Sequence, residues 1–217
     1  MTAVPAPYDL GRKANRRWLG ICLAFLFLIA TWLATAIHEG GHALVHWMNG
    51  DTIYGFYFTP FAGQVLALYP ARPTALTGLE DLAGILVTQI TFFLLVGLRL
   101  AFRRTIPFVF DALYQMLLVM LAVDALYLAF SGPLHVADVY DATRSLGWSP
   151  YIFVVPGLVL CYVNYKLLRR LFRDWAQRWF ADTATGSRWM VIRWCVATWF
   201  LTTVVYWSVY PLKWPSP

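Results

Sequence analysis

The stretch WLGICLAFLFLIATWLATAI, residues 18–37, decides the fold class of this chain because it contains no charged residue. A helix needs about 20 apolar residues to cross roughly 30 Å of hydrocarbon, and this stretch is long enough. A basic segment precedes it, but the apolar run is too long for a signal peptide and lacks a small-residue cleavage site. We therefore expect a membrane-spanning helix that begins at Trp18 and continues as a helix to Met48.

The composition of the whole chain also indicates a membrane protein. Of its 217 residues, 60% are hydrophobic and 13% are charged, whereas an average soluble domain is about 25% charged. The apolar content excludes a disordered chain, and the presence of only three cysteines excludes a disulfide scaffold. Four further apolar runs predict spans at residues 82–100, 106–130, 151–168 and 194–212. We expect an all-α polytopic membrane protein with about five transmembrane helices.

Lysine and arginine residues alternate between the loops that these spans define, and this alternation predicts the orientation. They gather before the first span and in the connections after the second and fourth spans, whereas the opposite loops hold three, Arg72, Arg144 and Lys213. The rule that cytoplasmic loops are basic then predicts a cytoplasmic N-terminus, in a multi-pass protein of the bacterial plasma membrane. The net charge of +6 is accounted for by this topology, and we expect no nucleic-acid partner.

Two connections on the predicted outer side are long. The first contains β-like residues Thr52–Thr59, a turn at Pro60–Gly63 and a second β-like run at Gln64–Tyr69, which predicts a small β-hairpin at the membrane surface. The second, Ser131–Pro150, is polar and acidic, and we expect a loop there.

The motif His38-Glu39-Gly40-Gly41-His42 lies at the outer end of the first predicted helix. Residues i and i+4 share one helix face, so both imidazoles can reach one zinc ion, and the intervening glutamate can accept a proton from metal-activated water. Glu39 is the only acidic residue in the first span, where an ionisable group indicates function. The structural alternative is that the histidines lie at the membrane–water interface and that Gly40-Gly41 only permits close helix packing.

A catalytic zinc needs a third protein ligand. His46 is eight residues from His38, about 12 Å along a helix, which is too far for one ion to bridge. A glutamate as third ligand, as in gluzincins, is disfavoured because Glu80 is the only glutamate besides Glu39. A metzincin site is excluded because Met48 occupies the position of its third histidine. The candidates that remain on the same side of the membrane are Asp124, His135, Asp138 and Asp141. Haem ligation by two histidines is disfavoured, because only His135 lies outside the first helix.

These features resemble the site-2 protease group, the M50-type intramembrane zinc metalloproteases. In that family the third ligand is an aspartate in an N-x-x-P-x-x-x-x-D-G pattern. Pro133 and Asp138 keep this spacing, but Phe130 and Val139 replace the asparagine and the glycine, so the match is partial. The resemblance implies Asp138 as the third ligand, with Asp124 as the alternative.

A second, weaker element of the resemblance opens the second span. Ala83-Gly84 is similar to the start of the family's A-G-P-L-A-N element, with Ile85 in place of the proline. Thr88 falls on the asparagine position and Gln89 is adjacent to it. The resemblance implies that these two residues contact the substrate or the transition state.

The resulting expectation is a zinc metalloendopeptidase in which His38, His42 and Asp138 hold Zn²⁺ and Glu39 is the general base. Its substrates would be membrane proteins or peptides, and partner membrane subunits are conceivable. We expect one integral membrane domain over 1–217, with a cytoplasmic segment 1–17, a metalloprotease-like core 18–146 and two further spans in 147–217. The alternative function is a non-proteolytic M50-like structural or regulatory subunit of a membrane complex.

Overall fold

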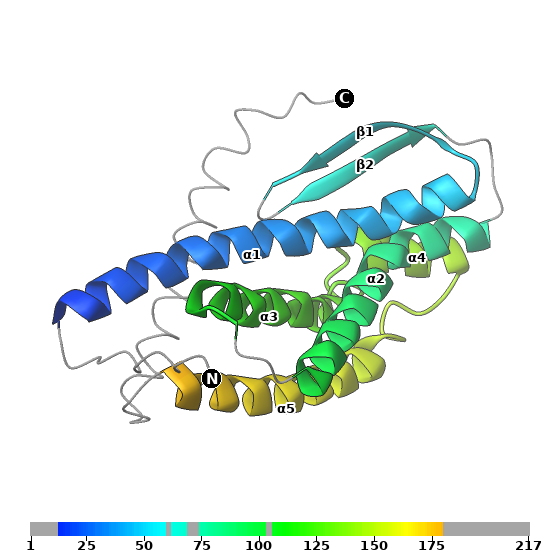
Figure 1. Cartoon of the computed structure of the whole chain (residues 1–217). Helices are drawn as coiled ribbons and strands as arrows, with labels where there is room; N and C mark the ends of the chain where they lie inside the picture. Colours follow the sequence, from blue (N-terminus) through cyan, green and yellow to red (C-terminus); the bar gives the residue numbers. More distant parts are fainter. Residues whose placement is uncertain (1–12, 60–61, 69–73, 103–105, 180–217) are drawn as a thin grey trace. The chain divides into compact units, whose positions relative to one another are not determined.

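The computed structural model describes residues 13–59, 62–68, 74–102 and 106–179. The described chain is mostly helical with one small two-stranded antiparallel sheet (Figure 1). Its elements in chain order are α1 (Lys13–Met48), β1 (Thr52–Phe58), β2 (Gly63–Leu68), α2 (Thr74–Ala101), α3 (Phe108–Phe130), α4 (Ala137–Leu146) and α5 (Val154–Trp179). The predicted fifth span, 194–212, lies outside the described residues.

Three of the described helices are long and apolar enough to cross a membrane. They are formed by Arg17–Met48, Ala75–Ala101 and Phe108–Phe130, and they coincide with the first three predicted spans. The fourth predicted span falls largely within α5, which is not among the three. Lys166, Arg169 and Arg170 lie in the middle of α5 and limit its apolar length. Within the described residues, three of the five predicted spans therefore correspond to helices long and apolar enough to cross a membrane.

Helix α2 begins at Thr74, eight residues before the predicted start of the second span at Leu82. The prediction missed this part because Glu80 and Asp81 interrupt the apolar run. The structure nevertheless continues α2 through both residues in its second turn, where Glu80 Oε1 accepts a 2.9 Å hydrogen bond from Asn49 Nδ2. Both residues are therefore helical.

The expectation of a loop over Ser131–Pro150 was wrong, because this segment contains α4. The side chains of Val139, Ala142 and Thr143 are buried, whereas Asp141 is exposed. This i, i+3, i+4 spacing gives a short helix one apolar face, which hydropathy averaged over the segment does not reveal. Gly147 ends α4 in the left-handed region at φ 66°, a conformation that glycine adopts without strain.

The predicted β-hairpin is confirmed, with strand bounds that differ by one residue. The strands pair from Thr52 opposite Leu68 to Phe58 opposite Gly63. The hairpin runs alongside α1 (Figure 1), where the Trp32 indole Nε1 donates a 3.4 Å hydrogen bond to the carbonyl of Phe58. The hairpin thus lies beside the helix that carries the HEGGH motif.

The described chain divides into two compact units, the first formed by residues 13–30, 106–116 and 170–179. In this unit Asp111 is fully buried at the start of α3. Its Oδ2 accepts hydrogen bonds from Arg178 Nη1 at 3.1 Å and from Trp179 Nε1 at 2.8 Å. A buried carboxylate needs such partners, so Asp111 has a structural role here.

The second unit comprises Thr31–Thr105 and Leu117–Arg169 and contains the HEGGH motif. Its apolar core joins α2, α3 and α4 through the buried residues Leu82, Ile85, Leu128, Val139 and Ala142. Buried polar groups also link its helices. Gln89 Nε2 donates to the carbonyl of Leu121 at 2.9 Å, and Asn164 Nδ2 donates to Gln89 Oε1 at 2.9 Å.

The two glycines of the HEGGH motif have different surroundings. A Cβ atom at Gly41 would lie 2.6 Å from the carbonyl oxygen of Ala83 and 2.9 Å from the Cα of Gly84, whereas a Cβ at Gly40 would meet nothing within 4 Å. Gly41 therefore permits the backbones of α1 and α2 to cross in direct contact, as small residues do between membrane helices. The packing role considered for the glycine pair belongs to Gly41 alone.

We expect Gly41→Ala to destabilise the protein by about 1–3 kcal/mol, because the added methyl group must push two helix backbones apart. Gly40→Ala is the matched control, and it should be neutral or stabilising by up to about 1 kcal/mol because alanine favours helix. Thermal unfolding of the detergent-solubilised protein measures both. Equal effects of the two substitutions would contradict the close crossing.

Candidate metal centre

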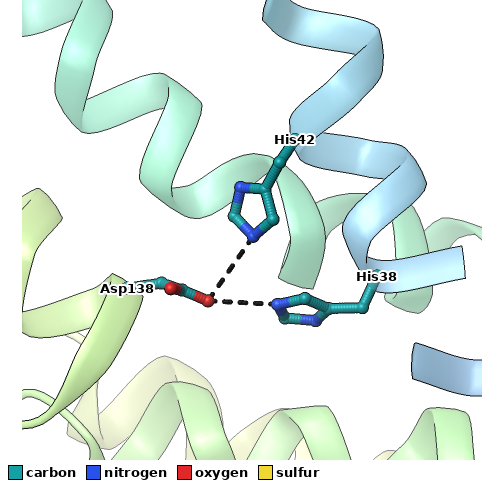
Figure 2. Close-up of side chains that lie close together, drawn as sticks. All are labelled: His38, His42 and Asp138. Carbon is teal, nitrogen blue, oxygen red and sulfur yellow. Dashed lines mark hydrogen bonds and ion pairs between the residues drawn. The ribbon is translucent and has the colours of Figure 1, made fainter. Parts of the chain in front are cut away.

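Two histidines of α1 and one aspartate of α4 point toward a common centre (Figure 2). His38 Nε2 lies 3.0 Å from Asp138 Oδ2, and His42 Nε2 lies 3.5 Å from the same oxygen. All three atoms lie within 4.8 Å of one another. A tetrahedral metal site with ligands at about 2.0–2.2 Å separates its donor atoms by roughly 3.3–3.6 Å, so a group this compact could hold a metal ion after small side-chain adjustments.

The other nitrogen of each histidine has its own acceptor. His38 Nδ1 lies 2.8 Å from Asp124 Oδ2, and His42 Nδ1 lies 2.7 Å from the carbonyl oxygen of Glu80. A carbonyl oxygen can only accept, so His42 Nδ1 carries the proton, and a carboxylate favours the same tautomer in His38. Each Nε2 is thereby directed at the common centre, where it donates to Asp138 when it is protonated and can offer its lone pair to a cation when it is not, as metal-binding histidines do.

The donor set fits a divalent cation. Two imidazole nitrogens and an anionic oxygen converge, and such electron-rich atoms need a positive charge between them. The space is kept open by Gly84 of α2, where a Cβ would lie 2.5 Å from both His38 Nε2 and His42 Nε2. Any side chain at position 84 would fill the gap between the two donor nitrogens.

Asp138 lies in the first turn of α4, where the helix dipole favours its negative charge. Burial raises the pKa of Asp138, but hydrogen bonds with His38 and His42 and the charges of these histidines outweigh burial and hold the pKa below its usual range. The carboxyl group is therefore ionised at neutral pH, which is the form that binds metal. Its backbone N–H donates to the Tyr127 hydroxyl at 3.2 Å.

Glu39 lies between the two histidines on α1 and is 7% exposed. Within the described residues its carboxylate has no hydrogen-bond or ion-pair partner, and it borders a cavity. It packs over Gly63, the first residue of β2, where a Cβ would overlap the Glu39 side chain. Glu39 is thus a buried residue that lies against the start of β2 at the wall of the cavity.

The cavity has a volume of about 330 Å³ and also borders His42 and Asp138. Five consecutive residues of β2, Gly63 to Ala67, line it. Alternate residues of a strand point to opposite faces, so a wall of consecutive residues means that the edge of β2 borders the cavity, to which Tyr54 of β1 also contributes. The other edge of β2 is paired with β1.

The structure gives Thr88 and Gln89, which sequence reasoning assigned to substrate contact, partners within the protein. The Thr88 hydroxyl donates to Asp124 Oδ2 at 2.6 Å and to the carbonyl of Ile85 at 2.8 Å. Both polar groups of Gln89 are used in bonds between helices. Asp124, the alternative third ligand, faces Nδ1 of His38, whereas Nε2 of His38 faces the common centre.

The remaining candidates lie apart from the His38–His42–Asp138 group. His46 Nδ1 lies 2.8 Å from Asp51 Oδ2, and these two residues form a separate group with Glu80. His135 is exposed in a turn and packs against the Tyr140 ring at 4.9 Å, and Asp141 is exposed on α4.

Sequence reasoning missed several groups at this site. Tyr127 follows Asp124 by three residues on α3, so the shared helix face was an available signal. Glu80 contributes its backbone carbonyl, which no side-chain pattern can reveal. Gly63 and Gly84 act through the absence of a side chain, and their roles become visible only once the neighbouring elements are in place.

No protein-family model, curated protein or solved structure matches this chain. The functional argument therefore depends on the geometry of the site.

We expect the purified protein to bind about one zinc ion per chain and Asp138→Asn to abolish this binding, because a direct ligand is lost. Asp124→Asn should instead weaken zinc affinity by about 10–100-fold, as loss of a ligand's hydrogen-bond partner does. Elemental analysis and titration against a competing chelator measure both effects, with Asp141→Asn as the control.

The opposite ranking, with Asp124→Asn abolishing binding and Asp138→Asn only weakening it, would make Asp124 the third ligand. A wild-type protein that binds no zinc would support the alternative of a non-proteolytic subunit.

Proposed function

We propose that this chain is a membrane-embedded zinc metalloprotease that hydrolyses peptide bonds in membrane-protein substrates. The observation that carries the proposal is the convergence of His38 Nε2, His42 Nε2 and Asp138 Oδ2 beside a buried, unpartnered carboxylate in the part of the chain that the structure describes. Metal ligands alone would also suit a structural site. A free carboxylate adjacent to them at a cavity favours hydrolysis.

The distribution of polar residues on α2 supports a membrane location. Leu86, Ile90 and Leu94 are more than half exposed, whereas Thr88 and Gln89 are almost fully buried. A soluble helix shows the reverse arrangement, because water favours polar residues outside. A lipid solvent favours apolar residues outside and hydrogen-bonded polar residues between helices. We extend the three apolar helices to a multi-pass protein with a cytoplasmic N-terminus on the basis of the basic loops.

The ligand set fits zinc, which would supply a Lewis acid that acidifies water and polarises the scissile carbonyl. The protein supplies the base. Glu39 accepts a proton from the attacking water and later delivers it to the leaving amine. Its burial and the absence of a partner among the described residues leave its oxygens available for this transfer. The His38–Asp124 and His42–Glu80 hydrogen bonds hold both imidazoles in the orientation that ligation needs.

The cavity suits an extended peptide. The edge of β2 that borders it can pair with a substrate strand through main-chain hydrogen bonds, and Glu39 packs over the first residue of that strand. A peptide added to this edge would pass directly by Glu39. A transmembrane substrate helix would need to unwind locally to bind in this way.

We expect Glu39→Gln to retain zinc and to reduce cleavage by at least about 10²–10⁴-fold, the usual contribution of a general base. Zinc content by elemental analysis and cleavage of a single-span membrane-protein panel in detergent, read by mass spectrometry, test both parts. Cleavage that survives the substitution while zinc is retained would rule out this role of Glu39.

We expect Gly63→Ala to impair cleavage while leaving zinc content unchanged, because the atoms nearest to the added methyl group all belong to Glu39, whose side chain it would displace. Gly40→Ala, which adds a methyl group to the same motif in open space, is the matched control. If Gly63→Ala cleaved as fast as wild type, Glu39 would not act from the position described.

A further inference from the structure

The cavity beside the candidate metal centre is strongly acidic. The described residues that line it include four carboxylates and no lysine or arginine, the carboxylates being Glu39, Glu80, Asp81 and Asp138. Two histidines, His42 and His46, also border it. The cavity therefore attracts positive charge beyond what a metal site alone requires.

Three of these four carboxylates already have roles or partners. Asp138 faces the two histidines, and Glu39 is the proposed base. Glu80 Oε1 accepts a hydrogen bond from Asn49 Nδ2 at 2.9 Å and lies 4.0 Å from His46 Nδ1. These contacts leave Asp81 as the carboxylate to be explained.

Asp81 has no hydrogen-bond or ion-pair partner in the described part of the chain. It is half-buried, and its charge is opposed by the nearby negative charges of Asp138 and Asp141. A partly buried carboxylate among like charges is unfavourable unless a cation compensates it. Zinc at the centre would be satisfied by its own ligands, so Asp81 is available for a second positive group.

The walls of the cavity fit a long basic side chain. Val65, Leu66 and Ala67 of β2 line the same cavity as Asp81 of α2. Lysine and arginine combine an apolar stem with a charged end, and they pack the stem on apolar surface while the charge reaches a polar group. In a peptide strand paired with β2, every second side chain would point to the same side.

We infer that Asp81 forms a specificity subsite for a lysine or arginine side chain of an extended peptide bound along β2. The inference rests on the proposed function, which supplies the peptide substrate. Glu39, only 7% exposed and without a hydrogen-bond partner among the described residues, borders the same cavity, and a second buried acidic side chain left without a partner there also points to a ligand.

Binding of peptide hydroxamates to the zinc-loaded full-length protein tests the subsite without requiring turnover. The hydroxamate anchors each peptide at the metal, and lysine is moved through successive positions and compared with norleucine, its uncharged counterpart. At one position we expect lysine to bind about three- to tenfold tighter than norleucine, as for a partly buried ion pair. This preference should weaken as salt is added, since screening reduces the attraction.

Three variants locate the effect. Asp81→Asn should remove the lysine preference, whereas Asp141→Asn, which removes the same charge from an exposed position on α4, should keep it. Asp81→Lys should reverse the preference, so that a peptide with glutamate at that position binds tighter than one with lysine.

The outcomes separate this inference from the proposal on which it rests. Equal binding of lysine and norleucine peptides at every position, or a lysine preference that persists in Asp81→Asn, would overturn the subsite and leave the metalloprotease intact. Failure of every hydroxamate to bind the zinc-loaded wild type would contradict the metalloprotease and the subsite together.

Discussion

The close crossing of α1 and α2 at Gly41 is the contact on which the candidate site depends. Because the helix backbones touch at Ala83 and Gly84, the carbonyl of Glu80 lies within hydrogen-bond distance of His42 Nδ1. The same approach brings Gly84 against the Nε2 atoms of both histidines. One small residue on each helix thus sets the orientation of the imidazoles and keeps the space between them open.

The carboxylates around this crossing differ in role because they differ in surroundings. Asp124 contacts the Thr88 hydroxyl and the Nδ1 of His38, so it orients the His38 ring. Asp138 faces two Nε2 atoms at the start of α4 and is held ionised. Glu39 and Asp81 border the cavity and have no protein partner within the described residues. Asp124 and Asp138 are thus engaged by protein groups, whereas Glu39 and Asp81 border the cavity.

Hydropathy was sufficient to locate the long helices, because an apolar run of about 20 residues in a chain with 13% charged residues predicts a membrane-spanning helix. Hydropathy did not reveal α4, because Asp141 and other polar residues lower the mean hydropathy of a helix that has one apolar face. It also missed the start of α2, where Glu80 and Asp81 interrupt the apolar run. The hairpin was predictable from β-branched and aromatic residues around a proline and glycine turn. Its free edge was not, since an edge is defined by what lies beside it.

The sequence by itself determined how His38 and His42 lie relative to each other, because an i, i+4 spacing places both side chains on one face of a helix. It also limited the third ligand to a few candidates. Only the tertiary structure shows how the two aspartates are placed, since both lie beside His38 but Asp138 faces Nε2 and Asp124 faces Nδ1. The roles of Gly63, Gly84 and Asp81 likewise arise from neighbours distant in sequence. Distances between elements are set by packing, which no local pattern encodes.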